Sequence, residues 1–346
     1  MHLPRLGARV AAALGVAAVV TVGACSPAAM MRESAQAGGG ETTAVTIQID
    51  GSAVPYYAPL YAAVEQGYFA DEGLDVEFSY ANGADIVQNV AAGNVDFGFP
   101  NADSVITARA NGVRTSVVHT TYQRGIGAVL FDNAGGISSP ADLAGRSVAV
   151  TDLGSPNYAQ LQAMLAHEGL TLDDVELRTI GTGAIVQALQ NGEVDAIVFS
   201  RLRYFALRTA GVDVGQILSD EYLPSFGNVL ITGPETAALR PRVAGGFARA
   251  LDAGIQHTID NVDETVDMAI EKYAPTFEGQ NAEIADVLRE VFVAELWQSD
   301  ETREHGFGHG DLDRWQAAID SQAEFGLIEE PFDAADLVRN ADDIDK

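Results

Sequence analysis

The sequence has 346 residues, a length that corresponds to about two packed globular units. Apolar residues make up 47% of the chain, so we expect a substantial hydrophobic core and no wholesale disorder. The formal net charge of −29 repels phosphate backbones, and nucleic acid is therefore not expected as a partner.

Residues 1–24 have the features of an export signal. Arg5 and Arg9 precede an apolar run from Val10 to Val22, and small residues then lead to Cys25, the only cysteine. The run is shorter than the ~20 residues that span a bilayer. The pattern resembles a bacterial lipobox and predicts that Cys25 is lipidated. The alternative is an ordinary secretory signal that happens to contain a cysteine.

A flexible tether is predicted to follow the signal. Residues 25–44 are small, polar and rich in glycine, a composition typical of a linker. Ordered structure should begin at Val45, because Val45–Ile49 alternates apolar and polar residues as a strand does.

A repeated pattern organises the next part of the chain. One copy runs from Ile86 to Asp96 and the other from Ile185 to Asp195; each has Ile-Val-Gln, a glycine five residues later, and then Val-Asp. Each copy predicts a helix that ends at the glycine, followed by a turn into an apolar strand. We therefore expect two similar α/β lobes with mostly parallel sheets flanked by helices, chance similarity being the alternative. After Pro234 the pattern is helical to the end.

The search for catalytic motifs gives no enzyme signature. The chain has no G-x-S-x-G serine motif, and no lysine follows a glycine-rich loop in its α/β part. His305 and His309 have the i, i+4 spacing of metal ligands, but glycines between them indicate a loop. We therefore expect no catalytic residues, no metal and no cofactor.

The loops after the predicted strands carry the candidate binding residues, because ligands of α/β lobes bind beyond the carboxyl ends of the strands. Tyrosines and neutral polar groups gather there, which suits a flat, largely neutral ligand. Ser155 before Pro156 also predicts a helix N-terminus with free N–H groups. The candidates are Tyr56, Tyr57, Asn101, Tyr122, Ser155, Asn157, Tyr158, Ser200 and Tyr204.

Within this set, Tyr57 and Tyr158 occupy corresponding loops of the two repeats. We expect them to sandwich the ligand ring, while Asn101, Asn157 and Ser200 bind its edges. The alternative for each tyrosine is that it packs in the core of its lobe.

Five segments of the chain resemble a known family. They are Pro55–Phe69, Glu72–Val76, Gly93–Gly98, Arg314–Gln316 and Phe325–Ile328. Together they are similar to the NMT1/THI5-like, SsuA-type periplasmic binding proteins, and the similarity extends from about Val45 to Leu337.

The resemblance implies a type II binding-protein fold, with two lobes joined by crossing strands near Gly127–Phe131 and Asn228–Thr232. Residues 45–133 and 225–346 would form the first lobe and residues 134–224 the second, with the ligand between them. It also implies a monomer that captures a small molecule at the outer face of the membrane and delivers it to the permease and ATPase subunits of an ABC importer.

Members of the family bind alkanesulfonates, taurine, nitrate, thiamine pyrimidine precursors or riboflavin. Sulfonate sites need several donors around an anion, and the tyrosine-rich loops fit an aromatic ligand better. Pyrimidine binders typically open with W-x-P-N-x-x-H-x-G, but this chain has Gly51, Ala53 and Tyr57 at the Trp, Pro and His. Riboflavin is therefore narrowly favoured over the pyrimidine precursor.

Two further classes of function are alternatives to a transport protein. Eukaryotic relatives are pyrimidine-synthesising enzymes that use pyridoxal phosphate and a Schiff-base lysine. Here the only lysines are Lys272, in the helical tail, and the terminal Lys346, which argues against an enzyme. A ligand-sensing lipoprotein that works without a transporter is the third class.

The lipobox interpretation predicts that Cys25→Ala releases or mislocalises the protein, because the alanine cannot carry acyl chains. Phase partition in detergent extracts measures this. The wild type should enter the detergent phase and the variant the aqueous phase. A wild type found in the aqueous phase would mean that the signal is an ordinary secretory one.

Overall fold

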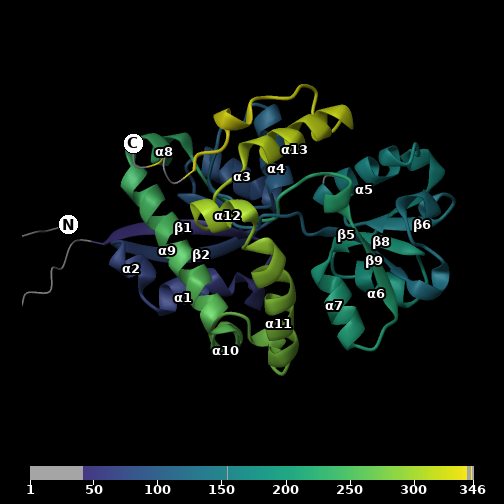
Figure 1. The fold of residues 1–346 in the computed structure, drawn as a ribbon, viewed down its shortest axis with the longest axis horizontal. Helices are drawn as coiled ribbons and strands as arrows, with labels where there is room; N and C mark the ends of the chain where they lie inside the picture. Colours follow the sequence, from purple (N-terminus) through teal and green to yellow (C-terminus); the bar gives the residue numbers. More distant parts are fainter. Residues whose placement is uncertain (1–41, 154, 341–343, 345–346) are drawn as a thin grey trace, which may run out of the picture. The chain divides into compact units, whose positions relative to one another are not determined.

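The structure is a computed structural model that describes residues 42–153, 155–340 and 344. The predicted export signal, Cys25 and nearly all of the predicted tether lie outside the described residues. Residues 41–346 form one compact unit, which is built on two five-stranded sheets with helices packed around them (Figure 1). None of the described helices is long and apolar enough to cross a membrane.

The first sheet is formed by four strands from the beginning of the described chain and one strand that follows the second sheet in the sequence. Its strands, in order, are β2 (Leu74–Ala81), β1 (Thr43–Asp50), β3 (Phe97–Phe99), β10 (Leu230–Thr232) and β4 (Ser116–His119). Strand β1 is parallel to β2 and β3, whereas β10 is antiparallel to β3 and β4. The predicted alternation of β1 is confirmed, with Val45, Ile47 and Ile49 buried. The strand begins at Thr43, two residues before the predicted start.

Helices cover both faces of this sheet. They are α1 (Ala58–Glu65), α2 (Tyr68–Asp71), α3 (Gly83–Ala91), α4 (Ala102–Ala110), α8 (Pro234–Leu239), α9 (Pro241–Asp260), α10 (Val262–Lys272), α11 (Asn281–Val287), the π-helix η7 (Leu288–Leu296), α12 (Asp300–His305) and α13 (Leu312–Glu324). Residues of α1, α9, α10, α11 and η7 share one core cluster with β1. Residues of α3, α4 and α13 share another with β10. The predicted helical tail therefore does return to the first sheet.

The second sheet is built from the middle of the chain. Its strands, in order, are β7 (Glu176–Thr179), β6 (Ser147–Val150), β8 (Ala196–Ser200), β5 (Gly127–Asp132) and β9 (Val214–Leu218). Strand β6 is parallel to β7 and β8, and β5 is antiparallel to β8 and β9. Helix α5 (Pro156–His167) packs in one core cluster of this sheet, and α6 (Ile185–Gln190) and α7 (Leu202–Thr209) pack in the other.

Short 3₁₀ helices occur in the connections between these elements. They are η1 (Pro55–Tyr57), η2 (Asn133–Gly135), η3 (Pro140–Leu143), η4 (Leu172–Asp174), η5 (Ser219–Glu221), η6 (Pro275–Phe277) and η8 (Ala334–Asp336).

The sequence repeat has the same structural role in each sheet. Gly93 and Gly192 both have positive φ values, of 73° and 68°, and end a helix before the next strand begins. The aspartate of each copy then binds the strand that has two parallel neighbours, β1 in the first sheet and β6 in the second. Asp96 accepts hydrogen bonds from the backbone N–H and hydroxyl of Thr46, at 2.9 and 3.2 Å. Asp195 accepts the same pair from Ser147, at 2.8 and 2.6 Å.

The boundary between the lobes differs from the prediction. Strand β5 pairs with β8 and β9, so the second lobe begins at Gly127 rather than at residue 134. Strand β10 pairs only within the first sheet. The two connections between the sheets are therefore residues 120–126 and 219–229. The expected crossing strands exist at the predicted positions, but each belongs to a single sheet.

One carboxylate joins the two connections. Oδ1 of Asp220 accepts hydrogen bonds from the backbone N–H groups of Gly125, at 3.0 Å, and Ser225, at 3.2 Å. The same oxygen accepts a hydrogen bond from the Arg314 guanidinium at 2.7 Å. The Arg314 guanidinium also lies over the ring of Phe226, 5.3 Å from its centroid. The Asp220 side chain is 10% exposed, so little water competes for these donors.

We expect Asp220→Ala to lower the free energy of unfolding by roughly 3 kcal/mol, because it removes the shared acceptor of two backbone N–H groups and of the half-buried Arg314 guanidinium. Urea denaturation measures the change. Asp313→Ala is the matched control, because Asp313 is exposed on the same helix as Arg314. Equal stability of the two variants would show that Asp220 does not hold the connections together.

Candidate ligand-binding site

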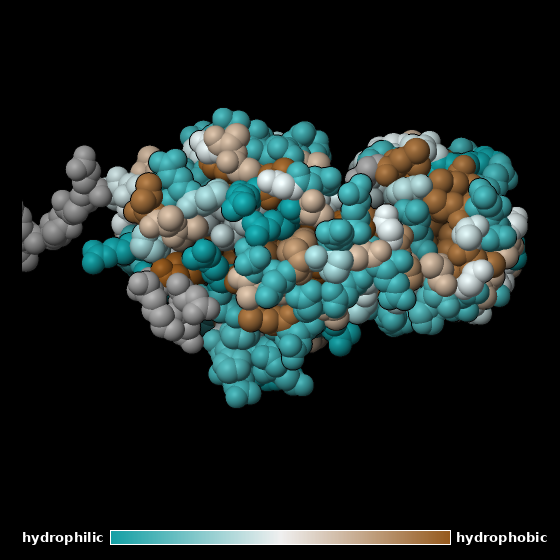
Figure 2. All heavy atoms as spheres, turned by 90° about the horizontal axis from the view of Figure 1, so that it is seen from above, coloured by the Kyte–Doolittle hydropathy of each residue, from teal (hydrophilic) through white to brown (hydrophobic). Residues whose placement is uncertain are grey.

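A pocket lies where the two lobes meet, and the surface is visibly indented between them (Figure 2). Its volume is about 570 Å³, within the ~300–1,000 Å³ typical of small-molecule sites. We call it the interlobe pocket. It is lined by Ala84, Asp85, Gln88, Asp103, Ser104, Thr107, Ala108, Asn111, Leu153, Ser155, Pro156, Tyr158, Ala159, Gln162, Gln322, Gly326 and Leu327.

Two loops at the carboxyl ends of strands lead into helices that supply part of the polar lining of this pocket. One loop follows β3 in the first lobe and leads into α4, where Asp103 and Ser104 lie. The other follows β6 in the second lobe and leads into α5 through Ser155. The pocket therefore lies beyond the carboxyl ends of strands, where ligands of α/β lobes bind.

The N-terminus of α5 forms the second lobe's side of the pocket. Ser155 is its N-cap, as predicted: the hydroxyl accepts a hydrogen bond from the Tyr158 N–H at 3.3 Å and donates one to the Asp152 carbonyl at 2.8 Å. Pro156 occupies the first helical turn. Because first-turn N–H groups lack helical partners, this end favours a ligand atom with negative partial charge.

Asp103 is the buried acid of the pocket and connects the lobes. Its Oδ2 accepts a hydrogen bond from Gln160 of α5 and its Oδ1 accepts one from Gln322 of α13, both at 3.1 Å. The side chain is 4% exposed, and burial raises the pKa of the carboxyl to about 6. The negative charge of Asp220 raises this pKa further, whereas the two amide donors lower it.

A second carboxyl with a raised pKa lies near the same strand ends. Asp50 ends β1, and burial raises its pKa to about 6, against the lowering effect of the Gly51 and Gly83 N–H groups. A Cβ atom at Gly83 would lie 2.9 Å from the Ser104 hydroxyl and 3.8 Å from Asp50 Oδ2, so Asp50 borders the Ser104 side of the pocket. Neither Asp50 nor Asp103 is predictable from the sequence, because carboxylates are so frequent in this chain.

The predicted tyrosines have different environments in the structure. Tyr158 lines the pocket and also packs on the core of the second lobe. Tyr56 stacks on Phe292, with centroids 5.4 Å apart, and the Tyr57 hydroxyl donates a hydrogen bond to the Asp50 carbonyl at 2.6 Å. Burial raises the pKa of the Tyr56 hydroxyl to about 12 and holds that of Tyr57 well above its usual value. Both hydroxyls therefore stay neutral.

Two of the expected binding tyrosines are packing residues instead. Tyr122 is 3% exposed and lies in the first lobe's core, where its ring meets Phe99 and Phe292 edge-on. Tyr204 lies on α7, where its ring contacts Phe205 and the Arg208 guanidinium. Neither lines the interlobe pocket, because their rings are used by the core and by their own helix.

Two of the polar candidate residues bind backbone N–H groups that are close to them in the sequence. Asn101 caps α4 by accepting the Asp103 N–H at 3.1 Å, and the Ser200 hydroxyl accepts the Leu202 N–H at 3.3 Å. Asn157 is half-buried in the first turn of α5 but does not line the pocket. No ring contact joins Tyr57 and Tyr158 among the described residues. Of the nine predicted residues, Ser155 and Tyr158 line the pocket, and Asn101 positions Asp103.

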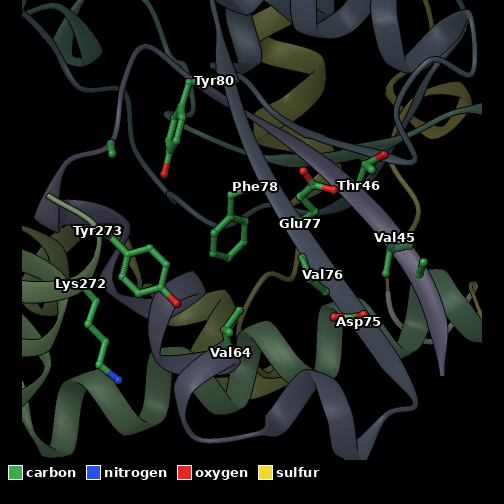
Figure 3. Close-up of a pocket in the computed structure, with 12 residues that line it drawn as sticks. Val45, Thr46, Val64, Asp75, Val76, Glu77, Phe78, Tyr80, Lys272 and Tyr273 are labelled. Carbon is green, nitrogen blue, oxygen red and sulfur yellow. The ribbon is translucent and has the colours of Figure 1, made fainter.

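A larger concavity of about 670 Å³ lies at the edge strand β2 (Figure 3). Phe78 and Tyr80 lie on one side of β2 with Tyr273, and Glu77 lies on the other. Two of its hydroxyls already have partners: the Tyr80 hydroxyl bonds to Tyr61, and the Tyr273 hydroxyl donates to Glu65 at 2.9 Å. This concavity belongs to one lobe only, so we assign the candidate site to the interlobe pocket.

The sequence of this chain matches a known family and several known proteins. A family described as NMT1/THI5 like matches residues 54–265. The riboflavin-binding protein RibY of Chloroflexus aurantiacus is 26% identical and covers 94% of this chain and 95% of its own. A formylaminopyrimidine-binding protein of Halalkalibacterium halodurans is also 26% identical, over 82% and 86%. A 4-amino-5-hydroxymethyl-2-methylpyrimidine phosphate synthase of Aspergillus parasiticus is 27% identical over 45% of each chain.

Solved structures support the predicted fold. A protein of Bordetella bronchiseptica has a TM-score of 0.69 and 24% identity, covering 87% of this chain and 95% of its own. The aliphatic sulphonate binding protein SsuA of Escherichia coli has a TM-score of 0.66 and 17% identity, covering 86% and 92%. The predicted type II periplasmic-binding-protein fold is therefore confirmed.

The environment of Asp103 predicts how stability depends on pH. Its native pKa of about 6 exceeds the 3.8 of an unperturbed aspartate, so the native state holds the proton more tightly. The wild type should therefore lose stability relative to Asp103→Asn as the pH rises from about 4 to about 6, by up to about 3 kcal/mol. Urea denaturation of both proteins across this range measures the difference.

Asp195→Asn is the control of opposite sign. Hydrogen bonds from Ser147 lower the pKa of Asp195, so its contribution to stability is present above pH 4 and is lost as the pH falls below that value. If the wild type and Asp103→Asn keep a constant difference in stability between pH 4 and pH 7, the raised pKa of Asp103 is wrong.

Proposed function

The chain belongs to the NMT1/THI5-like family, and on this premise we propose that it is a solute-binding protein that captures a flat heteroaromatic molecule in the interlobe pocket. The observation that carries this proposal is the composition of that pocket. Tyr158 offers an aromatic face, and amide, hydroxyl and carboxyl groups surround it. Such a combination orients an uncharged ring by stacking and by hydrogen bonds to its edge.

The charge of the pocket argues against an anionic ligand. Among the residues that the structure describes, Asp85 and Asp103 are the only charged ones that line the pocket, and no lysine or arginine does. An alkanesulfonate, taurine or nitrate ion carries a negative charge that these carboxylates would repel and that no cation would neutralise. Ring N–H groups or sugar-like hydroxyls could instead donate hydrogen bonds to Asp103.

Riboflavin is the ligand that we favour, narrowly over a thiamine pyrimidine precursor. The relative named for riboflavin binding matches nearly the whole chain, and the one named for formylaminopyrimidine binding matches somewhat less. The relatives named as synthases match less of it, 45% for the protein of Aspergillus parasiticus and 65% for one of Legionella pneumophila, which favours a binding protein over an enzyme. The aminopyrimidine edge also complements a carboxylate, so the pocket itself admits both ligands.

The same premise places the protein in transport. We propose that it is anchored at the outer face of the cell membrane through Cys25, acts as a monomer, and delivers its ligand to the permease and ATPase subunits of an ABC importer. A lipoprotein that senses the ligand without a transporter is the alternative. A neighbouring pair of permease and ATPase genes would favour import.

Thermal-shift screening tests the ligand class. Riboflavin or the pyrimidine precursor should raise the melting temperature, because a ligand at one hundred times its Kd adds about 2.7 kcal/mol to the stability of the folded state. Taurine, alkanesulfonates and nitrate should give no shift. A shift with these anions alone would overturn the aromatic-ligand proposal. No shift with any compound would contradict the proposed ligand set.

Tyr158→Ala tests the site itself. Loss of a stacking ring should weaken ligand binding more than about tenfold, since ~1.4 kcal/mol corresponds to a factor of ten. Tyr204→Ala is the matched control, because Tyr204 belongs to the same lobe but does not line the pocket. Titration of both variants measures the affinities. Equal affinities would place the ligand elsewhere.

A further inference from the structure

We propose that Glu301, His305 and His309 form a binding site for a divalent transition-metal ion of the Zn²⁺ type. One ligand atom from each of the three side chains lies within 4.8 Å of those of the other two. The site is separate from the interlobe pocket, and none of the three residues lines that pocket. This inference therefore does not depend on the ligand proposed above.

The local backbone brings the three side chains together. Glu301 and His305 are one helical turn apart on α12, and their Oε2 and Nε2 atoms are 3.8 Å apart. The helix ends at Gly306, which has φ 97°, and Gly308 has φ 71°. These two glycines turn the chain back, so that the imidazole rings of His305 and His309 stack with centroids 4.4 Å apart. The glycines that indicated a loop in the sequence thus create the cluster.

The loop that carries His309 is held in place by the first connection between the lobes. The backbone N–H of Thr120 donates to the Gly308 carbonyl at 2.7 Å, and the Gln123 amide donates to the His309 carbonyl at 3.0 Å. A Cβ atom at Gly308 would lie 2.1 Å from the His119 ring, so glycine is required there. The backbone of His309 is therefore positioned without a metal, which lowers the entropic cost of binding one.

The geometry is within reach of zinc coordination. Tetrahedral Zn²⁺ takes nitrogen and carboxylate oxygen at about 2.0–2.2 Å, which places neighbouring ligand atoms roughly 3.4 Å apart. The ligand atoms now lie up to 4.8 Å apart, and side-chain rotations that move each by about 1 Å would bring them to this spacing. Two imidazoles favour Zn²⁺, Cu²⁺ or Ni²⁺ over Mg²⁺ or Ca²⁺, which prefer oxygen. Three protein ligands leave the fourth position to water or to a partner's side chain.

Further polar groups lie beside this cluster. His305 and His309 line a cavity of about 180 Å³ together with His119, Asp252 and Arg249. The His119 Nε2 atom is 2.8 Å from Asp252 Oδ1, and the Arg249 guanidinium pairs with Glu72 at 2.8 Å. The positive charge of Arg249 is thus offset by Glu72, and the surroundings add carboxylate oxygens near the site.

Isothermal titration of the purified protein with ZnCl₂, in a buffer that does not chelate metals, tests the proposal. We expect the wild type to bind one Zn²⁺ ion saturably at this site. His305→Ala and His309→Ala should each weaken binding more than about tenfold, because each removes one of three ligands. Glu301→Gln should also weaken it, since the amide carries no charge. His167→Ala is the control, because His167 lies on α5 in the other lobe and should leave binding unchanged.

Cobalt provides a second readout. Co²⁺ bound in a tetrahedral site gives visible absorption bands, which should appear with the wild type and be lost in His305→Ala and His309→Ala. Thermal melts would establish that the variants are folded, as expected for side chains near the surface. The proposal is overturned if the wild type shows no saturable Zn²⁺ binding, or if the two histidine variants bind Zn²⁺ as the wild type does.

Discussion

The arrangement of the two lobes depends on one buried carboxylate. A single oxygen of Asp220 accepts hydrogen bonds from both connections, through the N–H groups of Gly125 and Ser225, and from Arg314 of the helical tail. Three separate stretches of chain are therefore fixed relative to one another by one charged acceptor. Because the group is mostly buried, water does not substitute for any of these donors.

Asp103 likewise joins separate segments of the chain, within the pocket. It accepts one side-chain amide hydrogen bond from each lobe. The residue that is best placed to bind a ligand therefore also joins the two lobes at the pocket. A ligand that donates to Asp103 would have to compete with Gln160 or complete the remaining acceptor positions of the carboxylate. The Oε1 atom of Gln160 is buried and lacks a hydrogen-bond partner among the described residues. This oxygen could therefore accept a further hydrogen bond.

The candidate site could be predicted only in part. Ser155 was found because an N-cap followed by proline is a local signal, and the structure confirms that role. Tyr122 was misplaced because a tyrosine after a strand can turn into the core as easily as into a cleft, and nothing nearby in the sequence distinguishes these outcomes. Asp103 was missed for a related reason. Its partners Gln160 and Gln322 are 57 and 219 residues away, and in so acidic a chain one aspartate resembles any other.

The sequence by itself determined the features that short-range periodicity and backbone geometry encode. These include the alternation of β1, the helices of the tail, and the repeat, whose glycines adopt positive φ where each helix ends. The tertiary structure alone decided which side chains face the interlobe pocket. It also brought His309 to His305, through two glycine turns and bonds from the distant Thr120 and Gln123. The physical reason is that burial and turn propensity act over a few residues, whereas a site is made by contacts between segments whose approach depends on how whole lobes pack.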